Sequence, residues 1–482
     1  MKVPGIAMDM EKPNVIVIVS DTLRWDALAA NGGPGWLDIK TPELDDFASR
    51  SACFDFARVS SFPTIPMRTD CFTGRFSHPR YGWQELERGI TTLPQLFSGA
   101  GYTTQLLADT THLLRSCFWR TFRHFDFLRG HESDTPVSQL NNPPTRIVSD
   151  PRKTRVERNR TFEEPTIGDT HARDNDWWRY ESDRLNSRIC EKACHWLEDN
   201  FKGGPFFLWL DCFDPHEPWD PPEYLWRMYH KGYDGEPMTH PNYGSSDAYT
   251  DDELANLRAH YAGEATLVSK NIGRVLRLID DTGLMENSVV SVLSDHGIFV
   301  GERGRAGKSL IAPGVFDAFP QNTEISHLVW MMNIPGAEPG RYQNIVQPPD
   351  LMPTLLEACE IDIPDNVEGR SLMPTIRGEE DTKAPEVAIS TWTMPTHFSD
   401  ELVFCRRPAV TDGEWTLVLQ EPPEPETPQL FHISEDPGER EDLIMEEPGV
   451  ARDLFSRMIS WLVDMETPAG AIDRLKKVDW SA

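Results

Sequence analysis

The sequence predicts an α/β protein with a doubly wound, mostly parallel sheet flanked by helices, followed by a small C-terminal antiparallel α+β subdomain. Three observations predict this fold. Apolar runs rich in β-branched residues alternate with helical patterns through residues 1–384. These runs are apolar at successive positions, as in strands that helices cover on both faces. After residue 384 the pattern changes to short strands divided by the Pro-Glu-rich run EPPEPETP.

The expected elements alternate in a βαβ rhythm, in which helices join parallel strands. Strands are expected at 14–20, 54–60, 102–108, 206–212, 288–294 and 327–333. Helices are expected at 42–51, 92–101, 181–200, 251–281 and 350–358.

Two segments depart from that rhythm. Residues 130–180 are rich in Pro, Asn, Arg and Asp, and we interpret them as an inserted loop region, with a lid and an arm of a homo-oligomer as alternatives. Residues 385–482 contain the strand-like runs ELVFCRR, EWTLVLQ and QLFHIS and then a helical pattern around 449–465. We therefore expect a main domain at 1–384 and a small subdomain at 385–482.

The composition limits the partners and the compartment. In 482 residues, 77 acidic side chains outnumber 47 Lys and Arg, and the formal charge of -30 repels nucleic acid polymers and anionic membranes. No apolar stretch is long enough for a membrane span. The eight Cys include no CxxC pair, and the first residues show no secretion signal. We expect a cytoplasmic protein whose small anionic substrate needs local cations or a metal.

Polar residues directly after two apolar strands are the first candidates for a site. Asp21 follows 14–20, and Asp295 and His296 follow 288–294. In open parallel sheets, ligands bind beyond the carboxyl ends of the strands. Two carboxylates and one imidazole there would hold one divalent metal. The alternatives are a helix-capping role for Asp21 and a surface turn at Asp295.

The segment SFPTIPMRTDCFTGR supplies a third candidate. Pro66 suits the first turn of a helix and would place Thr64 at the N-terminus, where free N–H groups stabilise an anion. Arg68 lies one turn further on the same face. This arrangement suits phosphoryl or sulfuryl transfer, while an N-cap beside a solvated Arg is the alternative.

These motifs resemble the sulfatase-type members of the alkaline phosphatase superfamily. That family's nucleophile motif is Cys or Ser, any residue, Pro, any residue, Arg, and a Thr-Gly about five residues later. Thr64, Pro66, Arg68 and Thr73-Gly74 match it. The similarity continues through FFLWLDCFDPHEPWDPP, VVSVLSDHGIFVGERGRAGKS and DLMPTLLEACEIDIPDNVEGRSLMP to QLFHISEDPGEREDLI. It covers nearly the whole chain and implies that 1–384 is the catalytic domain.

The resemblance implies a role for each residue of the centre. Asp21, Asp295 and His296 would bind the metal, Thr64 would be the metal-activated nucleophile, and Arg68 would be its charge partner.

The resemblance extends to four further positions, and at two of them, Asp109 and His112, the motif is loose. His216 in DPHEP and Lys308 in GRAGKS match residues that hold substrate oxygens or protonate the leaving group. Asp109 and His112 fall where the family places substrate-contacting side chains, with a structural role as the alternative.

Two departures from the family pattern decide the expected chemistry. Sulfatases convert the Cys or Ser of the motif to formylglycine, which Thr64 cannot form, whereas a phosphorylated Thr can be hydrolysed by in-line attack at phosphorus. Sulfatases also tend to carry a second Asp where this chain has Thr22. With His296 as a ligand, Mn or Zn is favoured over Ca.

A second metal would need a further set of ligands. The nearest candidates, Asp211, Asp214, His216 and His397, form only an irregular set, so we expect a single divalent metal.

We therefore expect a metal-dependent hydrolase of phosphate diesters or phosphonate monoesters that forms a phospho-Thr64 intermediate. One alternative is a sulfatase that works without formylglycine. The other is a catalytically inactive binding protein that keeps the fold.

Overall fold

The computed structural model describes residues 12–132, 134, 148, 150–155, 166–312, 315–394, 404–420, 427–478 and 480. Among the helices in these ranges, none has the length and apolar character that crossing a bilayer requires.

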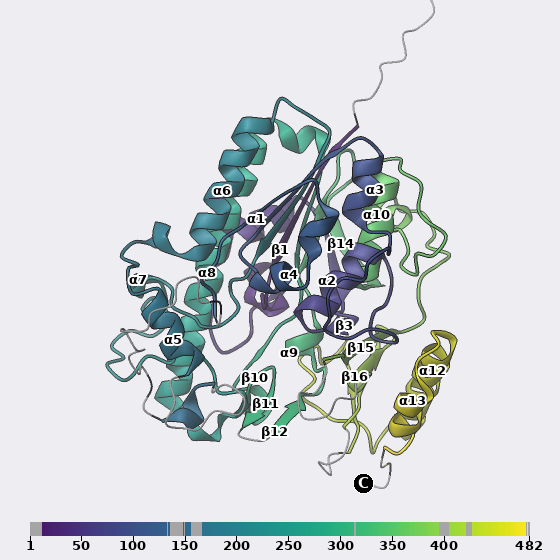
Figure 1. Ribbon diagram of the computed structural model, residues 1–482. Helices are drawn as coiled ribbons and strands as arrows, with labels where there is room; N and C mark the ends of the chain where they lie inside the picture. The colour runs from purple at the N-terminus through teal and green to yellow at the C-terminus, as the bar shows by residue number, and fades with distance from the viewer. Residues whose placement is uncertain are drawn as a thin grey trace, which may run out of the picture.

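An eight-stranded sheet forms the centre of the protein (Figure 1). In spatial order its strands are β14 (Gly340–Val346), β2 (Ala52–Ala57), β13 (Trp330–Asn333), β8 (Ser288–Ser294), β1 (Asn14–Ser20), β6 (Phe206–Cys212), β4 (Thr103–Ala108) and β5 (His124–Phe127). Neighbours pair in parallel, except that β13 runs antiparallel to β2 and β8. The expected mostly parallel sheet is confirmed.

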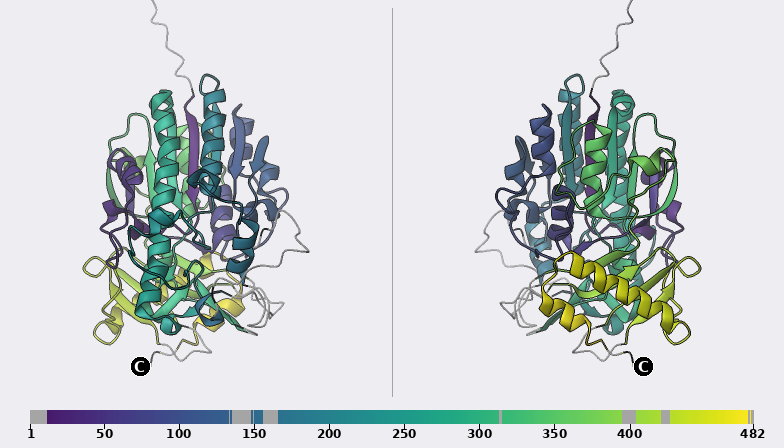
Figure 2. Two further views of the ribbon diagram at one scale, coloured as in Figure 1. Left: turned by 90° about the vertical axis from the view of Figure 1, so that its left-hand side faces the viewer. Right: turned by 90° about the vertical axis from the view of Figure 1, so that its right-hand side faces the viewer.

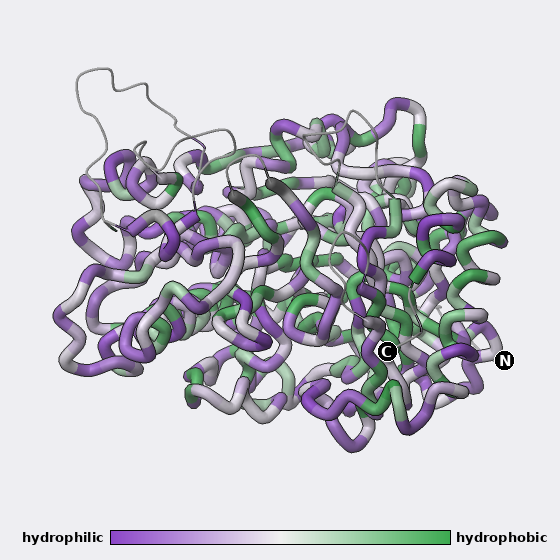
Figure 3. The backbone as a smooth tube through the Cα atoms, turned by 90° about the horizontal axis from the view of Figure 1, so that it is seen from below, coloured by the Kyte–Doolittle hydropathy of each residue, from purple (hydrophilic) through white to green (hydrophobic). Residues whose placement is uncertain are grey.

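Helices cover both faces of this sheet, which explains why its strands are apolar at successive positions. Along β1, Val15, Val17 and Val19 pack into one hydrophobic core, while Ile16 and Ile18 pack into the other. The first core contains residues of α2 (Thr64–Thr73), α3 (Leu93–Gly99) and α10 (Leu351–Ala358), and the second contains residues of α1 (Pro42–Ser49), α6 (Leu185–Asn200) and α8 (Asp251–Asp281). Figure 3 shows hydrophobic segments running through the middle of the molecule.

Several expected elements are observed with their expected bounds. The strands at 14–20, 206–212 and 288–294 and the helix at 251–281 match exactly. The expected strand at 54–60 is observed at 52–57, and the expected strand at 327–333 begins only at Trp330. The edge strands β5 and β14 were not expected, because polar residues interrupt their apolar pattern.

Short elements make the connections around the main sheet. The helices are α4 (Thr111–Arg115), α5 (Ile167–Asp174), α7 (Glu223–Trp226), α9 (Thr323–Ser326) and α11 (Met373–Ile376). The strands are β7 (Gly244–Ser245), β9 (Phe299–Val300), β10 (Arg305–Gly307), β11 (Ser309–Ala312) and β12 (Val315–Ala318). Among the described residues of the inserted region expected at 130–180, the α-helix is α5, which begins with a capping box at Thr166.

A second sheet extends the fold at the C-terminal end. Its order is β18 (Gln429–His432), β17 (Trp415–Val418), β16 (Arg406–Thr411), β15 (Ala388–Trp392) and β3 (Ser61–Phe62). The helices α12 (Pro448–Asp464) and α13 (Ala469–Leu475) lie beside it (Figure 2). The strands β15 to β18 are antiparallel, as expected, but β3 joins in parallel. The C-terminal sheet therefore holds the strand that leads directly into Thr64.

Candidate functional site

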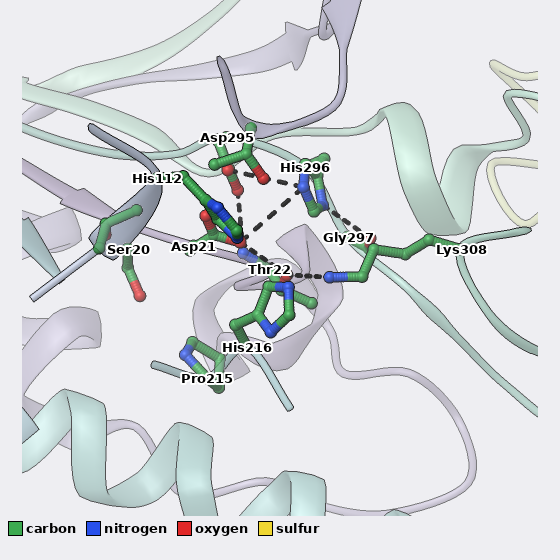
Figure 4. Close-up of polar contacts among 12 residues, drawn as sticks. Ser20, Asp21, Thr22, His112, Pro215, His216, Asp295, His296, Gly297 and Lys308 are labelled. Atoms are coloured by element: carbon green, nitrogen blue, oxygen red, sulfur yellow. Dashed lines mark hydrogen bonds and ion pairs between the residues drawn. The ribbon is translucent and has the colours of Figure 1, made fainter. Parts of the chain in front are cut away.

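The expected metal-binding residues come together at the carboxyl ends of β1 and β8. The two strands are parallel neighbours with Ser20 opposite Ser294, so the next residues, Asp21 and Asp295, lie side by side. Together with His296 they are fully buried and offer one ligand atom each, all within 4.8 Å of one another (Figure 4). This geometry is suited to a single metal ion.

Two buried polar atoms without a hydrogen bond support a cation at this position. Nδ1 of His296 donates to the carbonyl of Gly297 at 3.0 Å, which leaves its buried Nε2 without a hydrogen bond. Oδ2 of Asp21 is likewise buried without a hydrogen bond. Burial lowers the pKa of His296 to about 4, so the ring is neutral and its free lone pair can bind a metal. These residues fit a divalent cation.

Arg68 lies at the centre of the site and is fully buried. Its guanidinium donates two bonds to Asp211, at 2.8 and 2.9 Å, and one to Asp295 at 2.6 Å, and it lies 3.3 Å from Asp21. Burial alone would lower the pKa of Arg68, but these carboxylates outweigh it and raise that pKa. Three carboxylates face one guanidinium, so a divalent cation would bring the group to neutrality.

Thr64 is the first residue of α2, as expected, and only 3% of it is exposed. Its carbonyl accepts a hydrogen bond from Nη1 of Arg68 at 3.1 Å, and the same nitrogen donates to Asp295. One guanidinium therefore joins the backbone of Thr64 to the carboxylates of the candidate metal site. At a helix N-terminus, an oxyanion is also stabilised by free backbone N–H groups.

Lys308, between β10 and β11, points its side chain toward Thr22 in the same centre (Figure 4). Its Nζ donates to the Thr22 hydroxyl at 3.0 Å and lies 3.3 Å from Oε2 of Glu217. Burial would raise the pKa of Glu217, but His216 and Lys308 outweigh it and lower that pKa to about 2. Glu217 therefore remains a buried counter-ion of the ammonium group.

His216 stacks on Phe213, with ring centroids 4.1 Å apart. Its Nδ1 contacts the Glu217 carbonyl at 2.7 Å and must donate there, so Nε2 carries the lone pair of the neutral ring. Burial lowers the pKa of His216 to about 3. The sequence left two roles for His216, holding substrate oxygens or protonating the leaving group. A ring whose Nε2 carries a lone pair favours the role of a hydrogen-bond acceptor.

Asp109 has structural partners, in line with the alternative considered from the sequence. It accepts from the backbone N–H of Phe213 at 2.7 Å and contacts His131 at 3.1 Å. His131 also lies 3.7 Å from Asp214, and these two carboxylates outweigh burial and raise its pKa. His112 lies 3.6 Å from Glu132.

The described members of the irregular second set, Asp211, Asp214 and His216, do not form a group of metal ligands. Asp211 is already engaged by Arg68 and also accepts from Thr110 and from Trp209. His397 lies outside the described residues. Among the residues that the structure describes, Asp21, Asp295 and His296 form the one group close enough to hold a metal.

Sequence reasoning missed several residues of this site. Asp211 lies near the end of the apolar strand β6. The sequence suggested it only as a metal ligand and not as a partner of Arg68. Glu132, His131 and Arg155 come from the inserted region, where composition predicts loops but not contacts. Glu217 had a usable signal, because it directly follows the expected site residue His216 in the same motif.

The chain is similar to several known proteins. A family model described as Sulfatase matches residues 13–361. An arylsulfatase from Clostridium perfringens is 25% identical over 411 residues, covering 77% of this chain and 80% of that protein. Arylsulfatase K from Homo sapiens is 23% identical over 499 residues, covering 93% and 82%. The crystal structure of the phosphonate monoester hydrolase of Agrobacterium radiobacter superposes with a TM-score of 0.69 at 18% identity, covering 95% of this chain and 97% of that one.

Proposed function

This chain belongs to the sulfatase family, and from that premise we propose that it hydrolyses phosphate diesters or phosphonate monoesters through a covalent phospho-Thr64 intermediate. The observation that carries the proposal is the position of Thr64 at the start of α2, where its backbone carbonyl accepts a hydrogen bond from the same Arg68 nitrogen that donates to Asp295. Threonine cannot become formylglycine, so the proposed chemistry is direct displacement at phosphorus.

Asp21, Asp295 and His296 would hold one divalent metal, with Mn or Zn preferred to Ca because one ligand is an imidazole. When bound, the metal supplies a Lewis acid that lowers the pKa of the Thr64 hydroxyl and offsets charge on the transferring group.

In the proposed first step, the Thr64 hydroxyl releases its proton to solvent, the Thr64 oxygen attacks phosphorus, and the bond to the alcohol oxygen breaks. The alcohol leaves with a proton from a donor that solvent then reprotonates. We assign proton donation to Lys308, because the neutral His216 ring has its only N–H committed to the Glu217 carbonyl. Nε2 of His216 can instead accept a hydrogen bond. In the second step, water attacks phosphorus, its proton restores the Thr64 hydroxyl, and the phosphate monoester or phosphonate is released.

The charge distribution favours a singly charged substrate. Arg68 is already shared among three buried carboxylates, and Lys308 lies beside the buried carboxylate of Glu217. Little uncompensated positive charge therefore faces the transferring group, and an unpaired charge in a buried site costs several kcal/mol. A diester or phosphonate monoester brings one negative charge, and a phosphate monoester brings nearly two.

Sulfate ester hydrolysis is the second candidate function. The curated relatives compared above carry the name arylsulfatase, and a sulfate monoester is also singly charged. A catalytically inactive binding protein is disfavoured, because buried Asp21, Arg68, Asp295, His296 and Lys308 keep the atoms that the chemistry needs.

The test is a panel of aryl esters assayed on one metal-loaded preparation. We expect kcat/KM for bis(p-nitrophenyl) phosphate and p-nitrophenyl phenylphosphonate to exceed that for p-nitrophenyl phosphate. With p-nitrophenyl sulfate, we expect a burst of one equivalent followed by stalling, because a sulfated Thr64 is released slowly. Sustained turnover of the sulfate above that of the diester would refute the phosphorus assignment.

A further inference from the structure

Thr22 lies between the metal-binding carboxylates and Lys308, and all of its polar groups are used. Its backbone N–H donates to Oδ1 of Asp295 at 2.9 Å, and its hydroxyl donates to Oδ1 of Asp21 at 2.9 Å. The same hydroxyl accepts from Nζ of Lys308 at 3.0 Å (Figure 4). Its carbonyl accepts from Tyr261 at 3.1 Å.

The backbone of Thr22 adopts an unfavourable conformation to make these contacts. Its φ is +62°, in the left-handed region that β-branched residues rarely enter. The surrounding hydrogen bonds hold this conformation, and Thr22 is fully buried. Such backbone strain is maintained where neighbouring contacts over-determine it, commonly at functional sites.

We propose that Thr22 is a positioning residue that couples the metal centre to Lys308. Its hydroxyl occupies Oδ1 of Asp21, which leaves Oδ2 as the oxygen without a hydrogen bond. That hydroxyl gives its only proton to Asp21, so toward any other group it can act only as a hydrogen-bond acceptor. Lys308 donates the hydrogen bond that it accepts. One hydroxyl thus orients a metal ligand and fixes the ammonium group on its other side.

Glu217 completes the support of Lys308. Its Oε2 lies 3.3 Å from Nζ of Lys308, and Glu217 is fully buried. Glu217 sets the charge environment of the Lys308 ammonium group, whereas Thr22 sets the distance between that ammonium group and Asp21. Removing the Thr22 hydroxyl should therefore affect both metal affinity and oxyanion binding by Lys308.

The inference rests on the proposed function for the role of Lys308, so its test avoids turnover. Mn²⁺ is titrated into metal-free protein by calorimetry, comparing Thr22→Val with Thr22→Ser. Val keeps the shape and β-branching of Thr but lacks the hydroxyl, and hydrogen-bond partners of metal ligands typically contribute about 10–100-fold to affinity. We expect about a tenfold loss for Thr22→Val and near-wild-type affinity for Thr22→Ser.

The matched control is Thr104→Val. Thr104 is a fully buried threonine on β4 whose hydroxyl accepts one hydrogen bond, from the backbone of Arg123, and contacts no residue of the site. The Thr104→Val variant should have a slightly lower stability than wild type and an unchanged Mn²⁺ affinity. If Thr22→Val does not fold, Thr22→Ala removes the same hydroxyl without β-branching at positive φ.

The link to Lys308 is tested by a double-mutant cycle on inorganic phosphate binding to Mn²⁺-saturated protein. We expect Thr22→Val to weaken phosphate binding several-fold in the wild-type background and to have little effect in Lys308→Met. Additive effects, or Mn²⁺ affinity within twofold of wild type in Thr22→Val, would overturn the inference. Neither binding measurement depends on which ester the enzyme hydrolyses. A failure of the proposed function would appear in the assays of aryl esters and not in these binding measurements.

Discussion

Replacing Arg68 by Met should destabilise the metal-free protein strongly. The guanidinium is fully buried and pairs with Asp21, Asp211 and Asp295, whereas Met keeps much of the apolar stem and removes the charge. The variant would leave three buried carboxylates without their cation. Arg50→Met is the matched control, because Arg50 makes a two-pronged pair with Asp280 at the surface, where the side chains are 32% and 38% exposed.

The expected magnitudes differ because of burial. Removing one partner of a buried ion pair costs about 3–5 kcal/mol. Arg68 serves three carboxylates, so we expect about 5 kcal/mol for Arg68→Met. Surface pairs contribute about 1 kcal/mol or less, so Arg50→Met should cost no more than that. A bound divalent cation neutralises the same carboxylates, so saturation with Mn²⁺ should recover part of the loss in Arg68→Met alone.

Urea unfolding followed by circular dichroism, with EDTA or with saturating Mn²⁺, measures these differences. In EDTA, the urea midpoint of Arg68→Met should fall far below that of Arg50→Met. In Mn²⁺, the difference between the two midpoints should become smaller. Equal midpoints for the two variants would refute the buried-charge account. If Mn²⁺ leaves the difference between the two midpoints unchanged, the metal does not bind among these carboxylates.

Three further predictions concern the metal, the proton donor and pH. Chelation should abolish activity, and Mn²⁺ or Zn²⁺ should restore it better than Ca²⁺; recovery with Ca²⁺ alone would contradict the ligand assignment. Lys308→Ala should reduce kcat more for alkyl than for p-nitrophenyl leaving groups, since only poor leaving groups need protonation, and a uniform loss would exclude proton donation. Burial raises the pKa of Glu264 from its ordinary 4.5 to about 8, so the folded state binds this proton more tightly and loses stability as pH rises from about 4.5 through 8. Glu264→Gln should therefore raise Tm relative to wild type more at pH 9 than at pH 5, whereas a constant difference would refute this cause.

The sequence predicted those parts of the fold whose signals are local. Apolar runs bounded by polar residues gave the exact bounds of the central strands β1, β6 and β8. Helix α8 was equally clear, because Thr250 and Glu253 form a capping box before a long amphipathic segment. The edge strands β5 and β14 were missed, because strands with a solvated face lack a continuous apolar run.

The same distinction holds for the site. Asp21, Asp295 and His296 directly follow buried strands. The carboxyl ends of these strands lie at the same edge of the sheet, and this places the three residues close together. The pairing of Arg68 with Asp211 joins residues 143 positions apart and depends on how α2 packs against the sheet. No local pattern carries that information.

The positive φ of Thr22 and the pairing of β3 with β15 also have no local sequence signal. Both became visible only in the folded chain. Each concerns the support of the candidate residues, whereas the candidates themselves follow apolar strands and so have a local signal.

The most direct test of the central claim is to trap the covalent intermediate. Metal-loaded enzyme is mixed with bis(p-nitrophenyl) phosphate, quenched in acid within milliseconds and digested, and its peptides are examined by mass spectrometry. The account predicts a p-nitrophenyl phosphoryl adduct on Thr64 that accumulates to steady state and is absent from Thr64→Ala, whose kcat should fall by several orders of magnitude. Near-normal turnover by Thr64→Ala, with no adduct on the wild-type protein, would contradict it.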